Sequence, residues 1–499
     1  MKKTTCILMM LAVLMTACTP KSDMDLIERS ARIAARETAA TGINWVFSPM
    51  VDICRDARWG RIVEGGGEDP YLGGEIAKAM VYGYQGKDEN FDTDEVLTCV
   101  KHYALYGGAE AGRDYNQVFL TRQEALNGYL RPYQAAAEVY SDENRAAARE
   151  IAHECQVLLK NNGVLPLSKD ARIAVVGPLA QDPMAMTGTW AMSSHSRESV
   201  SLWQGISEVA KASYAEGSWL FQDAHLEENV RYGLYKAFVP GFQVPPVHPV
   251  NQQKLIAEAV SKARQADVVV ACVGEVPNLN GEGASRTDIG LPDAQRELLK
   301  ALKATGKPIV MVLVTGRPLT LVEEDASMDA ILNVWSPGSE GGHAVADVLF
   351  GDVNPSAKLT TTFPRNVGQL PLYPFGYGLS YTTFEYGPVA LSAAEMPLDG
   401  SVTASVTVNN AGTRDGDEIV QLYIHDIYAT STRPVKELKA FRKVHIKAGE
   451  SIQVDFTLTA EDLSYYNHEL EYVCEPGDFE IMIGPNSRDT DSIMLSVRE

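Results

Sequence analysis

The sequence predicts a multidomain α/β protein with three parts: an incomplete β/α barrel, an α/β sandwich with a mainly parallel sheet, and a C-terminal β-sandwich. In the first 140 residues, helical stripes alternate with two apolar strands that are too few to close a barrel. Between residues 142 and 365, continuous apolar runs alternate with amphipathic helices, which is typical of a parallel sheet covered on both faces. From residue 401 the apolar period changes to two, which indicates short strands.

Composition sets the first limits on function. The chain has 499 residues, 45% of them hydrophobic, which is enough for about two to four domains. Its net charge of −21 argues against a nucleic-acid partner, because phosphate binding needs a basic surface. The seven cysteines include no CxxC pair, and no cluster of ligands suggests a metal or cofactor.

The first 18 residues have the pattern of an export signal. Lys2 and Lys3 precede an apolar run over residues 7–15, and Thr16 and Ala17 lead to Cys18. The run is too short to span a bilayer. Small residues that end on a cysteine resemble a bacterial lipoprotein signal, with Cys18 as the lipidated terminus. The alternative is an ordinary cleaved signal, and either predicts export to the periplasm or cell surface.

Residues 25–140 have the helix–strand rhythm of a β/α barrel. The predicted elements are helix 26–40, strand 43–47, helix 71–84, strand 96–103 and a helix that is capped by Thr121 and Glu124 and runs to about Ala137. Trp45, Val46 and Phe47 suit a buried strand. A complete barrel takes about 250 residues, so this stretch predicts an incomplete barrel.

Residues 142–365 predict the α/β sandwich, residues 366–400 a linker and residues 401–499 the β-sandwich. The predicted elements of the α/β sandwich are helix 143–161, strand 171–180, helix 252–266, strand 267–275, helix 293–304, strand 308–318, strand 330–338 and helix 341–350. In the last part, alternating segments such as VTASVTVNN and EIVQLYIHD are separated by Gly, Asp and Asn turns.

A long loop follows the first predicted strand and is crowded with charge. This segment, SPMVDICRDARWGRIVEGGGEDPYL, resembles the signature loop of glycoside hydrolase family 3, the β-glucosidase and β-xylosidase family. Three later blocks support the resemblance: AREIAHECQVLLKNNGVLPL, WSPGSEGGHAVADVLFGDVNPSAKLTTTFP and LYPFGYGLSYTTFEY. The family implies a TIM-type barrel, an α/β sandwich and a fibronectin type III-like domain, here with internal deletions.

The resemblance also implies a chemistry. Such enzymes remove terminal β-linked sugars with retention, using two carboxylates about 5–5.5 Å apart and no cofactor. It places the sugar-holding residues at Arg61, Lys101 and His102, whereas Asp52 and Arg58 are expected to brace the loop. The structural alternatives are an ion pair of Arg61 with Glu64 or Glu68, and a simple loop contact for Lys101 and His102.

The acid/base of relatives comes from a loop of the sandwich domain, which corresponds here to residues 275–291. Glu282 occupies the position that resembles the catalytic glutamate, and Gly281 and Gly283 would let it swing against the barrel. The alternative is a solvent-exposed loop glutamate.

The nucleophile is not found. The family uses an aspartate at a late barrel strand, in the segment where this chain is short. The Ser141-Asp142 pair precedes a helix, so we interpret Asp142 as its N-cap. The sequence therefore predicts a β-glucosidase-type hydrolase that has lost its attacking carboxylate. A non-catalytic remnant and a carbohydrate-binding surface protein remain alternatives.

Overall fold

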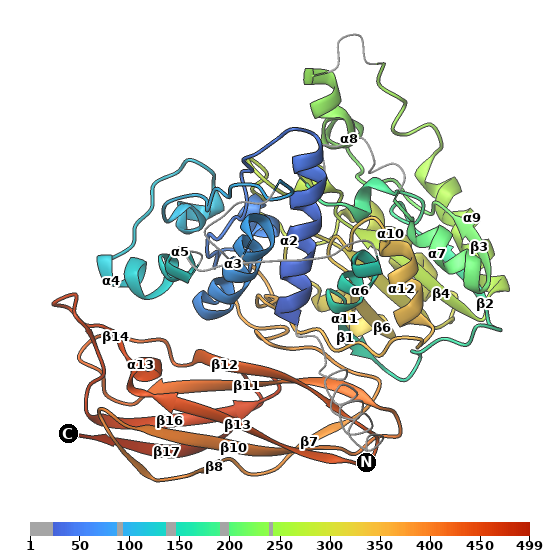
Figure 1. Cartoon of the computed structure of the whole chain (residues 1–499). Helices are drawn as coiled ribbons and strands as arrows, with labels where there is room; N and C mark the ends of the chain where they lie inside the picture. The colour runs from blue at the N-terminus through green and yellow to red at the C-terminus, as the bar shows by residue number, and fades with distance from the viewer. Residues whose placement is uncertain (1–22, 87–92, 136–145, 190–198, 239–242) are drawn as a thin grey trace, which may run out of the picture.

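The computed structural model describes residues 23–86, 93–135, 146–189, 199–238 and 243–499. An N-terminal part and the α/β sandwich lie side by side, and the C-terminal β-sandwich lies against them (Figure 1). Helix α2 (Asp23–Ala40) lies between the other N-terminal elements and the sandwich, in the middle of the view.

Two long helices form most of the N-terminal part. Helix α2 packs on α3 (Pro70–Gln85), close to the predicted bounds of both. The axes approach closely at Gly83, where a Cβ atom would lie 2.1 Å from the carbonyl oxygen of Glu28. Asp69 caps α3 by accepting a hydrogen bond of 2.8 Å from the Leu72 N–H.

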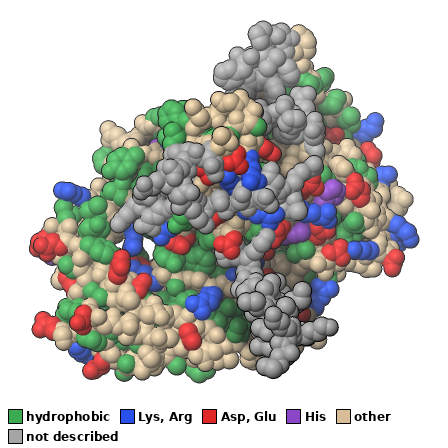
Figure 2. All heavy atoms as spheres, viewed as in Figure 1, with side chains coloured by type: hydrophobic (Ala, Val, Ile, Leu, Met, Phe, Trp, Pro, Cys, Tyr) green, Lys and Arg blue, Asp and Glu red, His purple; other side chains and the backbone are tan. Residues whose placement is uncertain are grey.

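The two predicted barrel strands lie parallel, but they form no regular ladder. They are joined by isolated bridges between Trp45 and Leu97 and between Met50 and Lys101. The prediction that this stretch is buried is wrong for two aromatic residues, because Trp45 is 52% and Phe47 is 66% exposed. No strand in the described ranges covers them. More generally, the N-terminal part shows hydrophobic side chains on its surface, at the left of Figure 2.

The last predicted N-terminal helix is broken into short pieces. Thr121 and Glu124 form the expected capping box. Helix α4 (Arg122–Glu124) is followed by a π-helical turn (Ala125–Tyr129) and by α5 (Arg131–Ala135). Asn127 exchanges hydrogen bonds with the backbone of Tyr466, so this region docks on the C-terminal domain.

A mainly parallel sheet forms the sandwich domain, as predicted. Its strand order is β1-β6-β5-β4-β2-β3, in which the β1–β6 pair alone is antiparallel. The strands are β1 (Val157–Asn161), β2 (Arg172–Val176), β3 (Lys211–Ala215), β4 (Val268–Gly274), β5 (Ile309–Val314) and β6 (Ala330–Asn333).

Helices cover both faces of this sheet. The helices of this domain are α6 (Ala146–Glu154), α7 (Leu202–Val209), α8 (Ala224–Phe238), α9 (Gln252–Gln265), α10 (Asp293–Lys303), α11 (Val322–Ser327) and α12 (Gly341–Leu349). Helix α8 projects away from the sheet at the top of the view (Figure 1). The helix predicted to run through Asn161 ends at Glu154, and the apolar run after it forms β1. Helices α7, α8 and α11 and strand β3 were not predicted from the sequence.

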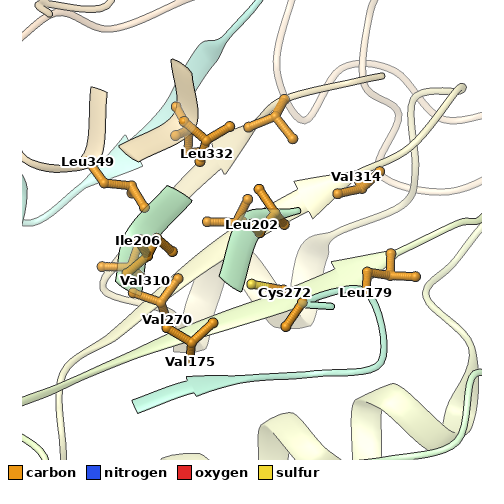
Figure 3. Packing of buried hydrophobic residues seen from close by; sticks show 14 of the residues in the cluster. Val175, Leu179, Leu202, Ile206, Val270, Cys272, Val310, Val314, Leu332 and Leu349 are labelled. Carbon is orange, nitrogen blue, oxygen red and sulfur yellow. The ribbon is translucent and has the colours of Figure 1, made fainter. Parts of the chain in front are cut away.

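The sandwich core explains the continuous apolar strands. Along β4, Val270 and Cys272 pack on one face, with Leu202 and Ile206 of α7 (Figure 3), while Val269 and Ala271 pack on the other. Because both faces are buried, the sequence shows no period of two here.

The C-terminal domain is a β-sandwich, as predicted. One sheet contains β13-β10-β7, with β8 paired to β10, and the other contains β12-β11-β16-β17-β9. The strands are β7 (Phe384–Tyr386), β8 (Ala390–Leu391), β9 (Glu395–Pro397), β10 (Ser401–Asn410), β11 (Gly416–Asp426), β12 (Glu437–Ile446), β13 (Ser451–Thr459), β16 (Gly477–Gly484) and β17 (Asp491–Arg498). Two smaller elements complete it: helix α13 (Ala460–Leu463) and the hairpin of β14 (Tyr465–Tyr466) and β15 (Tyr472–Val473). Across the described ranges, the helices are all too short or too polar to cross a membrane.

The Asp69 cap predicts a pH-dependent stability. Burial raises the pKa of Asp69 from its ordinary 3.8 to about 6, so the folded state binds its proton more tightly than the unfolded state. The free energy of unfolding should therefore fall as the pH rises from about 4 to 6, by up to about 3 kcal/mol. Asp69→Asn keeps an acceptor for the Leu72 N–H without ionising, so it should remove this loss.

Urea unfolding at several pH values from 4 to 7 measures the effect. The variant should match the wild type near pH 4 and exceed it above pH 6. The exposed Asp170→Asn variant is the control and should follow the wild-type curve. A constant difference between Asp69→Asn and the wild type across this range would refute the account.

Candidate active site

Arg61 lies at the centre of the candidate site. The 3₁₀ helix η1 (Gly60–Glu64) buries its side chain to 4% exposure. Its Nε and Nη2 atoms donate to the two carboxylate oxygens of Glu64 at 2.8 and 2.9 Å. Its Nη1 lies 3.6 Å from Oε2 of Glu282. Arg61 therefore makes the structural pair with Glu64 and also faces the candidate acid/base.

Glu68, the other suggested partner of Arg61, has a different role. Its carboxylate accepts hydrogen bonds from Thr361 and Thr362 of the sandwich domain, at 2.8–3.3 Å. The neighbouring Gly67 has a φ of +107°, and a Cβ there would lie 2.3 Å from the Thr360 carbonyl oxygen. The glycine-rich end of the loop thus docks directly on the sandwich domain.

His102 is oriented by a buried carboxylate. Its Nδ1 and its backbone N–H lie 2.9 and 2.8 Å from Oδ2 of Asp52, which is 2% exposed. The Tyr133 hydroxyl donates to the other Asp52 oxygen at 2.9 Å. Lys101 is fixed through its backbone, which pairs with Pro49 and Val51. The Asp52 contacts agree with the expectation that this residue braces the loop.

The loop that contains Glu282 is docked onto the N-terminal part. The Gly281 N–H donates to the Gly60 carbonyl at 2.5 Å, and the Arg286 N–H donates to the Arg58 carbonyl at 3.2 Å. Glu282 stands between two glycines with positive φ, +97° at Gly281 and +73° at Gly283, and its side chain is 33% exposed. These contacts bring Glu282 beside Arg61.

Two residues that the sequence analysis missed complete the cluster. The Arg61 guanidinium lies over the Tyr106 ring, 5.3 Å from its centroid, and His102 meets the same ring edge-on at 5.0 Å. Burial raises the pKa of Tyr106 to about 12, with Asp114 adding to this effect and Arg61 opposing it. Asp114 accepts from the Trp59 Nε1–H and from the Gly283 N–H.

The carboxylates around Glu282 accept hydrogen bonds from other protein groups. Both oxygens of Asp52, of Glu64 and of Asp114 accept hydrogen bonds from protein donors. Asp142 lies outside the described residues, so its interpretation as an N-cap stays a prediction. In the part of the site that the structure describes, these three acids are therefore bracing groups. Nor do the described residues include a group of three or more His, Cys, Asp or Glu side chains that could hold a metal ion.

Sequence comparison connects this arrangement with known proteins. Models of the glycosyl hydrolase family 3 N-terminal domain, its C-terminal domain and a fibronectin type III-like domain match residues 12–143, 156–381 and 418–487. A periplasmic β-glucosidase of Salmonella typhimurium is 35% identical, with 93% of this chain and 82% of that protein aligned. This chain belongs to glycosyl hydrolase family 3.

Other family 3 relatives define the type of enzyme. A β-xylosidase of Formosa agariphila is 28% identical, over 95% of this chain and 86% of that protein. The crystal structure of a mutant β-glucosidase from Listeria innocua in complex with laminaribiose superposes with a TM-score of 0.84 at 29% identity, covering 95% of this chain and 84% of that one. The chain is thus a family 3 glycosidase of the β-glucosidase and β-xylosidase type.

The alignment with the Salmonella relative is longer than this chain, 633 residues against 499. The relative therefore has residues inside the aligned region for which this chain has no counterpart. This agrees with the internal deletions that the sequence predicts.

The tight packing of Gly281 against the Thr189 side chain can be tested by comparison with Gly283. Both glycines have positive φ, but a Cβ at Gly281 would lie 2.3 Å from Cγ2 of Thr189, whereas a Cβ at Gly283 has nothing within 4 Å. Gly283→Ala should cost about 1 kcal/mol of backbone strain, and Gly281→Ala should cost clearly more. Gly281→Ala should also increase hydrogen exchange at residues 281–286. Equal exchange in the two variants would show that the loop does not depend on this contact.

Proposed function

We propose that this family 3 chain binds the terminal sugar of a β-glucoside or β-xyloside between its N-terminal loop and the 275–291 loop, but does not hydrolyse it rapidly. The observation that supports this most directly is the Arg61–Glu282 pair, which joins residues of the two loops at 3.6 Å. Each loop contributes one charged group to this pair, and Arg61 also lies over the aromatic ring of Tyr106.

The binding roles follow from the chemistry of the side chains. Arg61 and Lys101 can donate charge-assisted hydrogen bonds to sugar hydroxyls, and His102 is held by Asp52 in one orientation for the same task. Glu282 is placed to exchange a proton with the glycosidic oxygen, as an acid/base does in retaining hydrolysis. Glucose and laminaribiose complexes of the Listeria β-glucosidase support a terminal β-linked glucosyl unit as the ligand.

The covalent step is the part that we propose is lost. Retaining hydrolysis needs a second carboxylate with an oxygen free to attack the anomeric carbon. Asp52, Glu64 and Asp114 use their oxygens for protein donors, and the long alignment with the Salmonella relative supports the loss of internal segments. The chain therefore keeps the residues that bind the sugar but lacks the carboxylate that attacks it.

We also propose that the protein is exported to the periplasm or the cell surface and anchored through a lipid on Cys18. The N-terminal pattern of residues 1–18 supports this proposal, as does the periplasmic designation of the Salmonella relative. Residues 1–22 lie outside the described part of the chain.

Calorimetry with glucose and xylose, together with turnover of chromogenic β-glucosides and β-xylosides, tests the proposal. The wild type should bind one of the sugars and turn over its glycoside slowly or not at all. Lys101→Ala should weaken binding at least about tenfold, because a hydrogen bond from a charged donor contributes about 1.5–3 kcal/mol. The exposed Lys211→Ala variant is the control and should bind like the wild type.

Three results would overturn parts of the proposal. Rapid turnover that Asp142→Asn abolishes would identify a nucleophile after all. Failure of the wild type to bind either sugar would contradict a retained site. Polysaccharide binding that is unchanged in both Lys101→Ala and Glu282→Gln would favour the alternative of a carbohydrate-binding surface elsewhere.

A further inference from the structure

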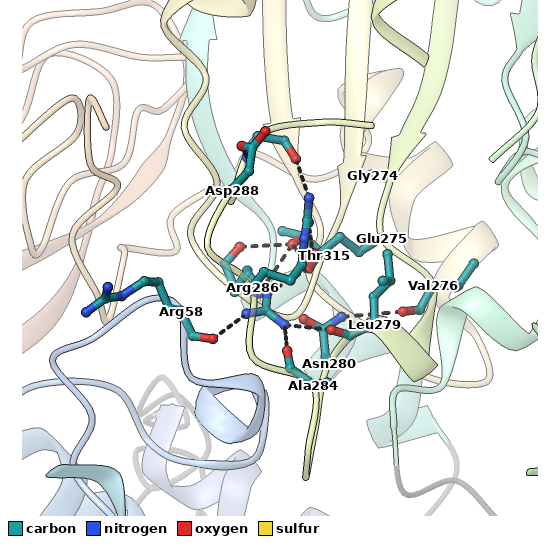
Figure 4. Close-up of polar contacts among 12 residues, drawn as sticks. Arg58, Gly274, Glu275, Val276, Leu279, Asn280, Ala284, Arg286, Asp288 and Thr315 are labelled. Carbon is teal, nitrogen blue, oxygen red and sulfur yellow. Dashed lines mark hydrogen bonds and ion pairs between the residues drawn. The ribbon is translucent and has the colours of Figure 1, made fainter. Parts of the chain in front are cut away.

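Arg317 is a fully buried arginine in the turn after β5, and it touches both loops of the proposed site. Its Nη1 donates to the Arg58 carbonyl at 2.9 Å, three residues before Arg61. Its Nη2 donates to the carbonyls of Leu279 at 2.6 Å and Ala284 at 2.8 Å, on either side of Glu282. Figure 4 shows the carbonyls of Arg58, Leu279 and Ala284 converging on one place. One guanidinium therefore spans the segments that position both members of the Arg61–Glu282 pair.

A second layer of contacts fixes Arg317 itself. Its Nε lies 3.3 Å from Oε2 of Glu275, which is also fully buried and accepts from the Thr315 hydroxyl at 3.1 Å. Arg286, at the far end of the Glu282 loop, binds the other Glu275 oxygen. Glu275, the first residue of the 275–291 loop, is thus bound to Arg286 in the later half of the same loop.

The charge balance around Arg317 makes its contacts with backbone carbonyls necessary. Two arginines share a single buried carboxylate, so the carbonyl oxygens have to satisfy the remaining donors of Arg317. A buried cation with an unsatisfied donor costs several kcal/mol. Displacement of either loop would remove hydrogen-bond acceptors from Arg317. The loops are therefore confined to positions at which their carbonyl oxygens accept hydrogen bonds from the guanidinium group.

Lysine cannot make the same set of contacts. Its ammonium group is a single point with three donors, whereas the guanidinium presents five donors in a rigid plane and can face two segments at once. Arg317→Lys keeps the positive charge beside Glu275 and loses the bridge between the loops.

We propose that Arg317 is a positioning residue that sets the placement of Glu282 against Arg61 without touching the sugar. The consequence for ligand binding rests on the proposed function, whereas the consequence for loop placement does not. Arg317 acts through backbone carbonyls, so its effect should be seen at the amides that join the loops.

The test compares Arg317→Lys with Arg433→Lys. Arg433 is an equally suitable buried arginine in the C-terminal domain, where it contacts Asp426, Glu437 and the Leu463 carbonyl at 2.8–3.0 Å. Hydrogen exchange at residues 281–286 and glucose affinity are measured for both variants, with thermal unfolding as a check on folding. Arg317→Lys should increase exchange at 281–286 and weaken glucose binding about 10- to 100-fold. Arg433→Lys should change neither.

The outcomes separate the two proposals. Wild-type exchange at 281–286 in folded Arg317→Lys would overturn the positioning role. Increased exchange with unchanged glucose affinity would overturn the consequence of this role for ligand binding. If the wild type binds no sugar while Arg317→Lys still loosens 281–286, the proposed function fails and the loop-positioning role stands. If Arg317→Lys does not fold, Glu275→Gln replaces it and should increase exchange at 281–286 to a smaller extent. Unchanged exchange in that variant would again overturn the proposal.

Discussion

The contact between Gly60 and Gly281 is the constraint on which the site depends. The Gly281 N–H donates to the Gly60 carbonyl at 2.5 Å, and a Cβ on Gly60 would lie 2.0 Å from the Gly281 carbonyl oxygen. Two backbones from different domains can approach this closely because Gly60 has no side chain. Arg61 follows one glycine and Glu282 follows the other, so the contact places both charged groups on the same side of the interface.

The regular elements could be predicted from the sequence because their patterns depend on nearby residues. The apolar stripe of α2 and the buried runs of β4 and β5 have periods that identify them directly. The run that became β1 could not be separated from the preceding helix, since a short apolar segment fits either structure. The exposure of Trp45 and Phe47 could not be predicted, because the same pattern describes a covered strand and only neighbouring chain segments decide between them.

In the site, too, some residues could be predicted from the sequence and others could not. Arg61, His102 and Glu282 were named from the family resemblance, and the structure brings Arg61 and Glu282 together. Tyr106 and Asp114 had no local signal, because their roles arise from contacts with residues that are distant in the sequence. Arg317 belongs to this second group: its importance lies in carbonyl oxygens, which every residue has and which no sequence motif reveals.

Binding of a sugar and nucleophilic attack on it depend on different side chains of the site. The holding groups Arg61 and His102 are kept in place by the carboxylates of Glu64 and Asp52. The central claim is thus that ligand binding persists without a covalent step. Incubation with a 2-deoxy-2-fluoro-β-glucosyl fluoride, followed by intact-mass measurement, examines this step directly. We predict an unchanged protein mass in a sample that binds glucose, whereas a gain of one fluorosugar on an aspartate or glutamate would contradict the account.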